Sequence, residues 1–162
     1  MQELNNKLDF LVRKRISELL EKPYAGSKAF KFNDPGAEYY SNCHGTMAFV
    51  LGLQDPAIKE DTHPDFIALG QMENLIEKYF SPSGNLNIGD LIAFYQKFPG
   101  MEEVLVHSAL LIGDNGEIFH QSGSGGVFRS SAIDDQLASF KVDKWDTYIR
   151  KFKKNKVISK VL

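Results

Sequence analysis

The chain has 162 residues, of which 43% are hydrophobic and 12% aromatic, so it is long enough for one domain with a buried core. Its net charge of -2 provides no basic field for nucleic acid, and no stretch is long and apolar enough for an integral membrane segment. The single cysteine excludes an intramolecular disulfide and a multi-cysteine zinc site, so we expect no metal and no cofactor.

The first half of the chain shows helical spacing of its apolar residues. Residues 3–21 are predicted to form an amphipathic helix that packs on the core, within an N-terminal segment covering residues 1–22. Residues 23–40 contain several prolines, glycines and aromatics, which favours an irregular segment. A second helix is expected to start at Cys43, and a third over residues 65–80, where a Ser-Pro-Ser-Gly sequence stops it.

The second half changes to the spacing of strands. Residues 88–96 and 104–112 are predicted strands, and Asp114-Asn115-Gly116 is a hairpin turn that leads into a strand over 117–121. A short strand at 127–129, a helix within 131–140 and a last strand over 144–152 complete the chain. We therefore predict one α+β domain over residues 1–162, with helices first and an antiparallel sheet second.

Cys43 is the strongest candidate for a reactive residue. Asn42, directly before it, is a favoured N-cap, which places the thiol in the first turn of a helix. The helix dipole and the unpaired amides there can lower a thiol pKa from about 8.5 towards neutrality. The opposing interpretation is a small buried core residue, the usual role of a free cysteine.

Two histidines on the predicted hairpin could activate this thiol. The turn at 114–116 pairs residues whose numbers sum to about 230, which offsets His107 and His120 by about three positions on neighbouring strands. The sequence leaves open whether their side chains share a face of the sheet. If they do, His120 or Gln121 could orient His107 while its other ring nitrogen faces Cys43, forming a Cys-His-polar triad.

Four ordered blocks carry a resemblance to a known family. They are Asn42-Cys43-His44-Gly45, then Gly-Asp-Leu-Ile-Ala-Phe at 89–94, then His-Ser-Ala-Leu-Leu-Ile-Gly at 107–113, then Glu-Ile-Phe-His at 117–120. Over residues 39–130 the chain resembles the NlpC-type papain-like cysteine peptidases of bacteria. The resemblance implies a papain-like fold, in which the helix that starts with the nucleophile packs on an antiparallel sheet, here with an extra N-terminal helix.

The resemblance also assigns roles. It implies that Cys43 is the nucleophile, His107 the general base and then acid, and His120 the orienting residue, with the Cys43 backbone N–H in the oxyanion hole. Tyr39 or Tyr40 corresponds to a tyrosine that precedes the cysteine in cell-wall peptidases. His44 is expected to line a substrate subsite or to meet solvent, and Gln121 is the alternative third triad member or a substrate contact.

These roles predict a cysteine peptidase or amidase that hydrolyses an amide bond through a thioester, with a bacterial cell-wall peptide as the usual substrate. An acyltransferase, thioesterase or deamidase with the same triad is the first alternative, and a catalytically inactive binding module is the second. The visible start lacks a leader pattern, which predicts a cytoplasmic enzyme or leaderless delivery by a specialised secretion system. An inhibitor or immunity protein is a further expected partner.

Overall fold

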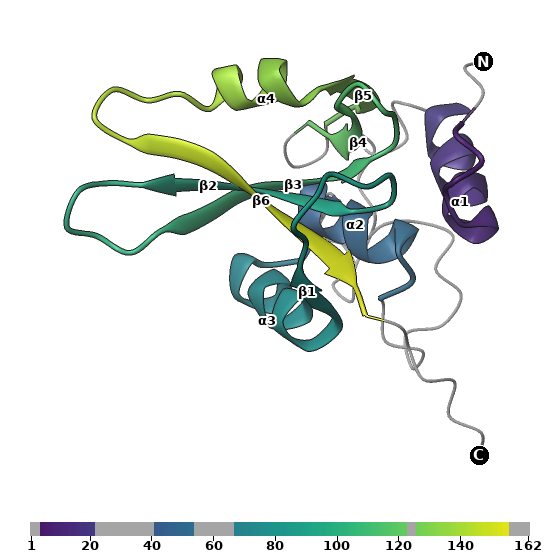
Figure 1. Cartoon of the computed structure of the whole chain (residues 1–162), viewed down its shortest axis with the longest axis horizontal. Coiled ribbons are helices and arrows are strands. Elements are labelled where there is room, and N and C mark those ends of the chain that lie inside the picture. The colour runs from purple at the N-terminus through teal and green to yellow at the C-terminus, as the bar shows by residue number, and fades with distance from the viewer. Residues whose placement is uncertain (1–3, 22–40, 54–66, 123–125, 156–162) are drawn as a thin grey trace, which may run out of the picture.

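The computed structural model describes residues 4–21, 41–53, 67–122 and 126–155, which adopt an α+β fold (Figure 1). Within these ranges the elements are α1 (Phe10–Glu21), α2 (Cys43–Val50), α3 (Leu69–Tyr79), β1 (Phe80–Pro82), β2 (Leu91–Lys97), β3 (Val104–Leu111), β4 (Glu117–Gln121), β5 (Phe128–Ala132), α4 (Ile133–Ser139) and β6 (Asp146–Lys154). The strands form one antiparallel sheet in the order β1-β6-β2-β3-β4-β5. The predicted α+β class is confirmed.

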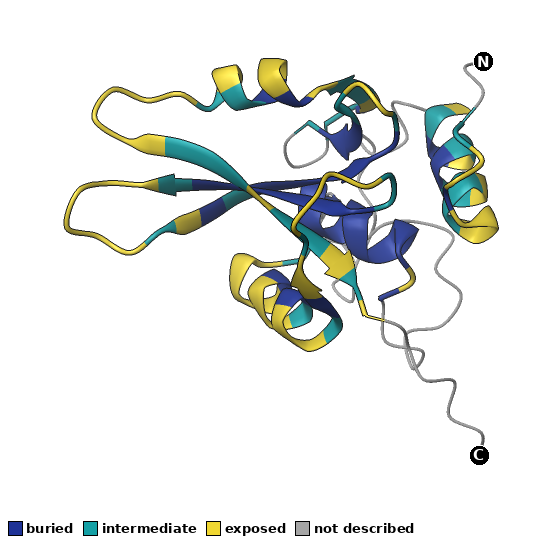
Figure 2. Ribbon diagram, in the orientation of Figure 1, coloured by how far each residue is buried: buried dark blue, intermediate teal, exposed yellow. Residues whose placement is uncertain are grey.

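The central strands of the sheet are buried on both faces, which β2 illustrates. Successive side chains of a strand point to opposite faces, so Leu91 and Ala93 pack in one apolar cluster and Ile92 and Phe94 in another. The first cluster includes Met47–Val50 of α2, and the second includes Ile133 of α4. Every residue of α2 is buried, as its uniformly dark ribbon in Figure 2 shows.

Two of the three helices predicted for the first half of the chain, those over 3–21 and 65–80, start later than expected. The helix predicted over 3–21 begins at Phe10, because Asp9 accepts the Leu11 amide N–H at 2.9 Å and so caps the helix there. Leu11, one of the apolar residues whose helical spacing predicted this helix, is 51% exposed. The helix predicted over 65–80 begins at Leu69, after residues 65 and 66, which lie outside the described ranges.

One strand was missed. The Ser-Pro-Ser-Gly sequence was read only as a helix stop, yet Phe80–Pro82 forms β1 and pairs with the end of β6. Proline is tolerated there because β1 is an edge strand of the sheet. The predicted strands around 88–96, 104–112, 117–121, 127–129 and 144–152 are confirmed with shifted ends. The segment 23–40, with Tyr39 and Tyr40, lies outside the described ranges.

The part of the chain that the structure describes contains no helix with the length and apolar character that a membrane crossing requires.

Candidate active site

The start of α2 is fixed by Asn42, as its sequence predicted. The Asn42 side-chain oxygen accepts the amide N–H of Gly45 at 2.8 Å, which is the N-cap geometry. The same oxygen accepts the Ile67 amide at 3.1 Å, and the Asn42 amide donates to the Ile67 carbonyl at 2.8 Å. Asn42 thus anchors both Cys43, in the first turn of α2, and the segment that leads into α3.

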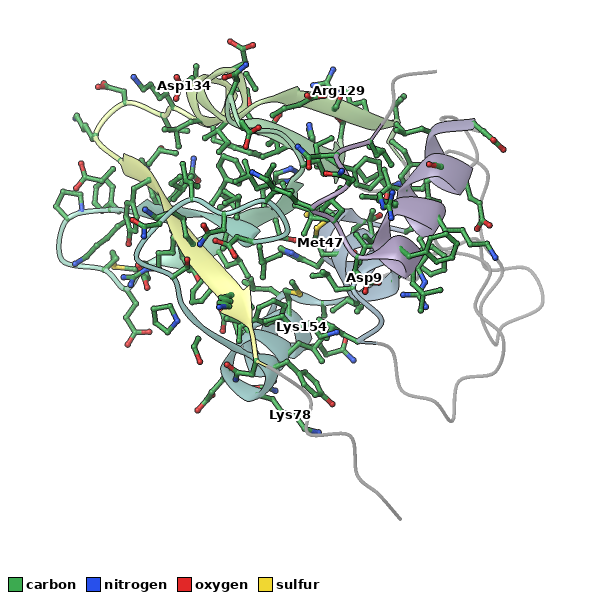
Figure 3. The ribbon with its side chains drawn as sticks, turned by 45° about the vertical axis from the view of Figure 1, so that its right-hand side comes forward. Asp9, Met47, Lys78, Arg129, Asp134 and Lys154 are labelled. Carbon is green, nitrogen blue, oxygen red and sulfur yellow. The ribbon has the colours of Figure 1, made fainter. Side chains whose placement is uncertain are left out.

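Polar contacts also hold α2 against β3 and β4. His44 Nδ1 lies 2.8 Å from the Ser108 hydroxyl of β3, and the Thr46 hydroxyl donates to the Gln121 side-chain oxygen of β4 at 2.8 Å. Apolar residues complete the contact, with Met47 in the interior of the molecule (Figure 3). The nucleophile candidate is therefore held by a rigid, fully packed helix.

Gln121 does not have the surroundings of a substrate contact or of a partner for His107. It is fully buried, its oxygen accepts from Thr46, and its Nε2 donates to the Gly126 carbonyl at 3.0 Å. His44 is buried as well and does not meet solvent, but it lines the same cavity as Cys43. Its Nδ1 lies 3.7 Å from the Cys43 sulfur.

The pairing of β3 with β4 shows whether His107 and His120 lie on the same face of the sheet. Leu110 pairs with Phe119 and Leu111 with Ile118, so paired numbers sum to 229, in agreement with the approximate value of 230 that the sequence predicted. A register change of one residue moves every side chain of a strand to the other face. Leu111 and Ile118 share a face, and by alternation His107 and His120 lie on that face too.

The His107 ring is held by contacts with three other rings. A β-bulge inserts Val106 between the paired residues Leu105 and His107, and such bulges re-aim the neighbouring side chain. The His107 ring packs against Phe94 and Phe140, with centroid distances of 5.4 and 5.3 Å. His107 Nε2 lies 3.0 Å from His120 Nδ1, and the two rings are nearly perpendicular at 88°.

A serine that the sequence analysis did not single out extends this pair. Ser131 of β5 has its hydroxyl 2.8 Å from His120 Nε2. Both nitrogens of His120 are therefore engaged, while Nδ1 of His107 has no hydrogen-bond partner in the described part of the chain. The sequence indicates only that Arg129 and Ser131, two residues apart, lie on one face of a strand. It does not indicate that this strand pairs beside His120, because no strong turn sequence fixes the register of β5 against β4.

Cys43 and His107 reach one cavity although α2 packs on the face of the sheet opposite His107. The β3–β4 ladder holds only the pairs at Leu110 and Leu111, so the strands part beyond them, where side chains from both faces can meet. The cavity has a volume of about 360 Å³. Its described lining consists of Asn42, Cys43, His44, Val106, His107, Ser122, Arg129, Gln136, Ser139 and Phe140.

The thiol does not have the lowered pKa that its position at a helix start predicted. Burial raises the pKa of Cys43 above its ordinary value. The Ser108 hydroxyl and the amides of Ser108, His44 and Cys43 itself favour the thiolate, but the loss of hydration outweighs them. The prediction was wrong because the sequence indicates a helix start, whereas it does not indicate how deeply that start is buried.

The histidines of the site are neutral at pH 7 for the same reason. Burial lowers the pKa of His107 to about 3, with repulsion from His120, His44 and Arg129 acting in the same direction. Burial and the nearby Arg129 lower the pKa of His120 to about 4, and burial alone lowers that of His44 to about 4. The resting site is therefore a neutral thiol beside neutral imidazoles, not a thiolate–imidazolium pair.

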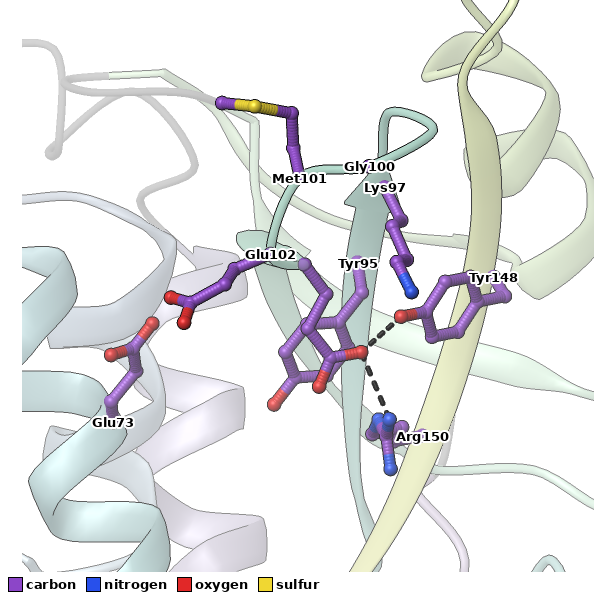
Figure 4. Close-up of a pocket in the computed structure, with 9 residues that line it drawn as sticks. Glu73, Tyr95, Lys97, Gly100, Met101, Glu102, Tyr148 and Arg150 are labelled. Carbon is purple, nitrogen blue, oxygen red and sulfur yellow. Dashed lines mark hydrogen bonds and ion pairs between the residues drawn. The ribbon is translucent and has the colours of Figure 1, made fainter.

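A larger cavity of about 800 Å³ lies between α3, β2 and β6 (Figure 4). Its centre is the Glu103 carboxylate, which accepts hydrogen bonds from the Tyr148 hydroxyl and from Arg150. None of the described residues that line it is a cysteine, serine, threonine or histidine. Chemistry that uses a thiol and a histidine base therefore favours the smaller cavity at Cys43.

Within the described ranges, no group of three or more histidine, cysteine, aspartate or glutamate side chains is arranged to hold a metal ion. Comparisons with protein-family models, with curated proteins and with solved structures found no match to this chain.

Proposed function

We propose that the protein is a cysteine hydrolase of the NlpC-type papain-like superfamily, which cleaves an amide bond through a thioester on Cys43. The observation that supports this best is the hydrogen bond between His107 Nε2 and His120 Nδ1, because it leaves the other ring nitrogen of His107 for the cavity that Cys43 also lines. The order of the sequence blocks agrees with that arrangement. A bacterial cell-wall peptide is the proposed substrate.

In the proposed reaction, His107 acts as a general base towards a neutral thiol. As the Cys43 sulfur attacks the substrate carbonyl carbon, its proton moves to His107 Nδ1, and the carbonyl oxygen becomes an oxyanion. The C–N bond then breaks, and the leaving amine takes the proton from Nδ1. Water attacks the thioester by the same route, with His107 as base, and releases the acid and the free thiol.

This role requires one arrangement of the protons on the histidines. Nδ1 of His107 must be free to accept, so its proton sits on Nε2 and is donated to His120 Nδ1. The proton of His120 then sits on Nε2 and is donated to the Ser131 hydroxyl oxygen. Ser131 is compatible with this arrangement as a positioning residue, because its hydroxyl oxygen can accept from His120 Nε2 and hold the ring in place.

The first turn of α2 supplies a donor for the oxyanion. The amides of Gly45 and Thr46 bond to Asn42, whereas the Cys43 amide bonds to no other residue within the described ranges and lies near its own sulfur. An amide that donates to the developing oxyanion stabilises the transition state by about 3–4 kcal/mol.

A second candidate function is a catalytically inactive binding module, and the neutral state of the site favours it. A buried thiol with a raised pKa is a poor nucleophile unless a base takes its proton during the attack. In that case the cavity binds a ligand, and Cys43 is a packed core residue.

The test compares release of new amino groups from bacterial cell-wall peptides by the wild type, Cys43→Ala, His107→Ala and His120→Ala. We expect no turnover with Cys43→Ala, a loss of about 100-fold or more with His107→Ala, and a loss of at least about tenfold with His120→Ala. Lys153→Gln, on the exposed side of β6, serves as the control variant outside the site and should keep the wild-type turnover.

A parallel measurement follows alkylation of Cys43 by iodoacetamide between pH 5 and 10. Alkylation of Cys43 that is already measurable below pH 8 and is lost in His107→Ala supports the hydrolase. The alternative outcome is an alkylation rate that rises only above pH 8, equally in the wild type and His107→Ala. That outcome, together with no turnover of peptides or acyl esters, would favour the binding module over the hydrolase.

A further inference from the structure

The first turn of α1 presents two large apolar side chains to solvent. Phe10 is 67% exposed and Leu11 is 51% exposed. The same helix packs on the core through Ile16 and Leu19, which are buried. Figure 1 shows α1 at one edge of the molecule, opposite the turn that joins β2 to β3. Two adjacent apolar side chains thus stay in water at an edge of the fold, although α1 has a buried side.

Cations surround this apolar pair. The Arg13 guanidinium lies over the Phe10 ring, 5.9 Å from its centroid, and the exposed Lys14 lies one helical turn after Phe10. Residues 4–17 contain four cationic side chains and one carboxylate. Glu18, one helical turn beyond Lys14, marks the end of this cationic stretch. The exposed side of the first turn of α1 is therefore apolar at its centre and positively charged around it.

A cavity of about 470 Å³ opens beside the same turn, between α1, the end of α2 and the end of β6. Leu11 forms part of its wall, so the cavity is continuous with the exposed apolar pair. Its described lining also contains three cations, Lys7, Arg15 and Lys154, and one carboxylate, that of Asp9. Figure 3, in which this side of the molecule comes forward, labels Asp9 and Lys154.

Two of these cations lie close together without a carboxylate partner from the described ranges. Arg15 Nη1 donates to the Val50 carbonyl at 3.3 Å, and Lys154 Nζ donates to the Leu51 carbonyl at 2.7 Å. Each cation keeps further N–H donors for another acceptor. Burial lowers the pKa of Lys154, and repulsion from Arg15 acts in the same direction. An anion in the cavity would relieve this repulsion and accept the remaining donors.

Charge distinguishes between the possible occupants of this surface. Two copies of α1 would bring cations against cations, which disfavours a second copy of the chain. Lys7 is within 3.8 Å of Asp114, but both side chains are largely exposed, so this ion pair is weak and can be exchanged for another anion. A phospholipid surface offers phosphates for the cations and hydrocarbon for Phe10 and Leu11.

We propose that the first turn of α1 docks the protein on an anionic phospholipid surface. Phe10 and Leu11 enter the boundary between the headgroups and the acyl chains. Lys7 and Lys14 contact lipid phosphates, and the cavity that Arg15 lines takes one of them. This docking goes beyond the proposed hydrolysis and does not depend on it.

The test measures sedimentation of the protein with vesicles of phosphatidylcholine, with and without phosphatidylglycerol. We expect binding to the mixed vesicles that added salt weakens, and binding to phosphatidylcholine alone that is at least about tenfold weaker. Phe10→Ser with Leu11→Ser should lower the affinity for mixed vesicles at least about tenfold. Met101→Ser with Val142→Ser is the matched control, because these side chains are 62% and 51% exposed at the opposite edge of the molecule.

The contribution of charge is measured with single substitutions. Lys7→Gln, Lys14→Gln and Arg15→Gln should each lower the affinity for mixed vesicles about fivefold. Lys141→Gln, in the exposed loop between α4 and β6, should change it less than about twofold. The proposal fails if the protein does not sediment with mixed vesicles, if it binds both kinds of vesicle equally, or if the control pair loses as much affinity as the α1 pair.

Two other occupants predict different results. If the cavity takes only a free phosphate, glycerol 3-phosphate binds in calorimetry and Arg15→Gln abolishes this binding, while no vesicles sediment the protein. If a second copy covers α1, sedimentation velocity without lipid shows a dimer that Phe10→Ser with Leu11→Ser dissociates. Either result, without binding to mixed vesicles, contradicts the proposal.

Fluorescence identifies which edge of the molecule meets the lipid. Trp145 is the only tryptophan of the chain, and it is 37% exposed in the loop before β6. We expect no emission shift of Trp145 when mixed vesicles are added to the wild type. Phe10→Trp combined with Trp145→Phe should shift its emission to shorter wavelength under the same conditions. The reverse pair of results would show that the opposite edge docks and that α1 does not.

Discussion

His44 should make the stability of the protein fall as the pH falls from about 6.5 to about 4. Its side chain is buried and neutral in the folded state, with a pKa of about 4, whereas its ordinary value is 6.5. Between these values the unfolded chain binds a proton that the folded chain does not, so acid favours unfolding. Above pH 6.5 both states are neutral at this position, and the stability contributed by the neutral, buried ring is fully present.

The size of this effect follows from the two pKa values. Between pH 7 and pH 5.5, His44 alone should lower the free energy of unfolding by about 1.2 kcal/mol. The measurement is urea unfolding at the two pH values, in the wild type and in His44→Asn, whose side-chain amide can keep the contact that Nδ1 makes with Ser108. The drop between the two pH values should be smaller in His44→Asn by about this amount.

Thr46→Val provides the control, because it removes a buried hydrogen bond of the same helix without removing a titrating group. It should lower stability equally at both pH values. If His44→Asn loses as much stability between pH 7 and pH 5.5 as the wild type, His44 is not held neutral in the folded state and the reasoning fails.

Three further predictions concern the groups around the site. Asn42→Ala should destabilise the fold by about 2 kcal/mol in urea unfolding, because it removes the N-cap of α2 and the bonds to the segment before α3. Lys154→Met should cost about 1–2 kcal/mol, since its ammonium bonds to a carbonyl at the end of α2, whereas Lys153→Met should cost little. Ser131→Ala should lower turnover several-fold with a change of at most about 1 kcal/mol in stability, and Ser131→Thr should restore the turnover if the hydroxyl acts through His120.

The sequence predicted the elements of the hairpin better than their register. Asp114-Asn115-Gly116 and the apolar strand before it indicate a turn and two paired strands, and Gly116 has the positive φ of 77° that such a turn requires. The exact pairing depends on the local bonds that close the turn, where the amides of Ile112 and Gly113 both bond to the Glu117 carbonyl. That closure sets the exact register, and a difference of one residue there decides whether His107 and His120 share a face.

Burial was the second property that the sequence could not supply. Asn42 before Cys43 indicates a helix start, and the structure has that start. The pKa of the thiol, however, depends on how much water α4 and the parted strands leave at the sulfur, and these elements lie 60 or more residues later in the chain. Ser131 and Arg129 were missed for a related reason. Their positions follow from the register of β5 against β4, and the Gly/Ser-rich sequence between these strands does not indicate where the loop ends and β5 begins.

The place where β3 and β4 part explains why the candidate site lies where it does. Paired strands satisfy their backbone groups by a continuous ladder, which leaves side chains of opposite faces separated by the sheet. Between β3 and β4 the ladder ends after Leu110, and side-chain bonds replace it: His107 to His120 on one face, and His44 and Thr46 of α2 to β3 and β4 on the other. A nucleophile from one layer can therefore meet a base from the opposite face without a long loop. The same opening places the Arg129 side chain of β5 at the cavity that Cys43 and His107 line.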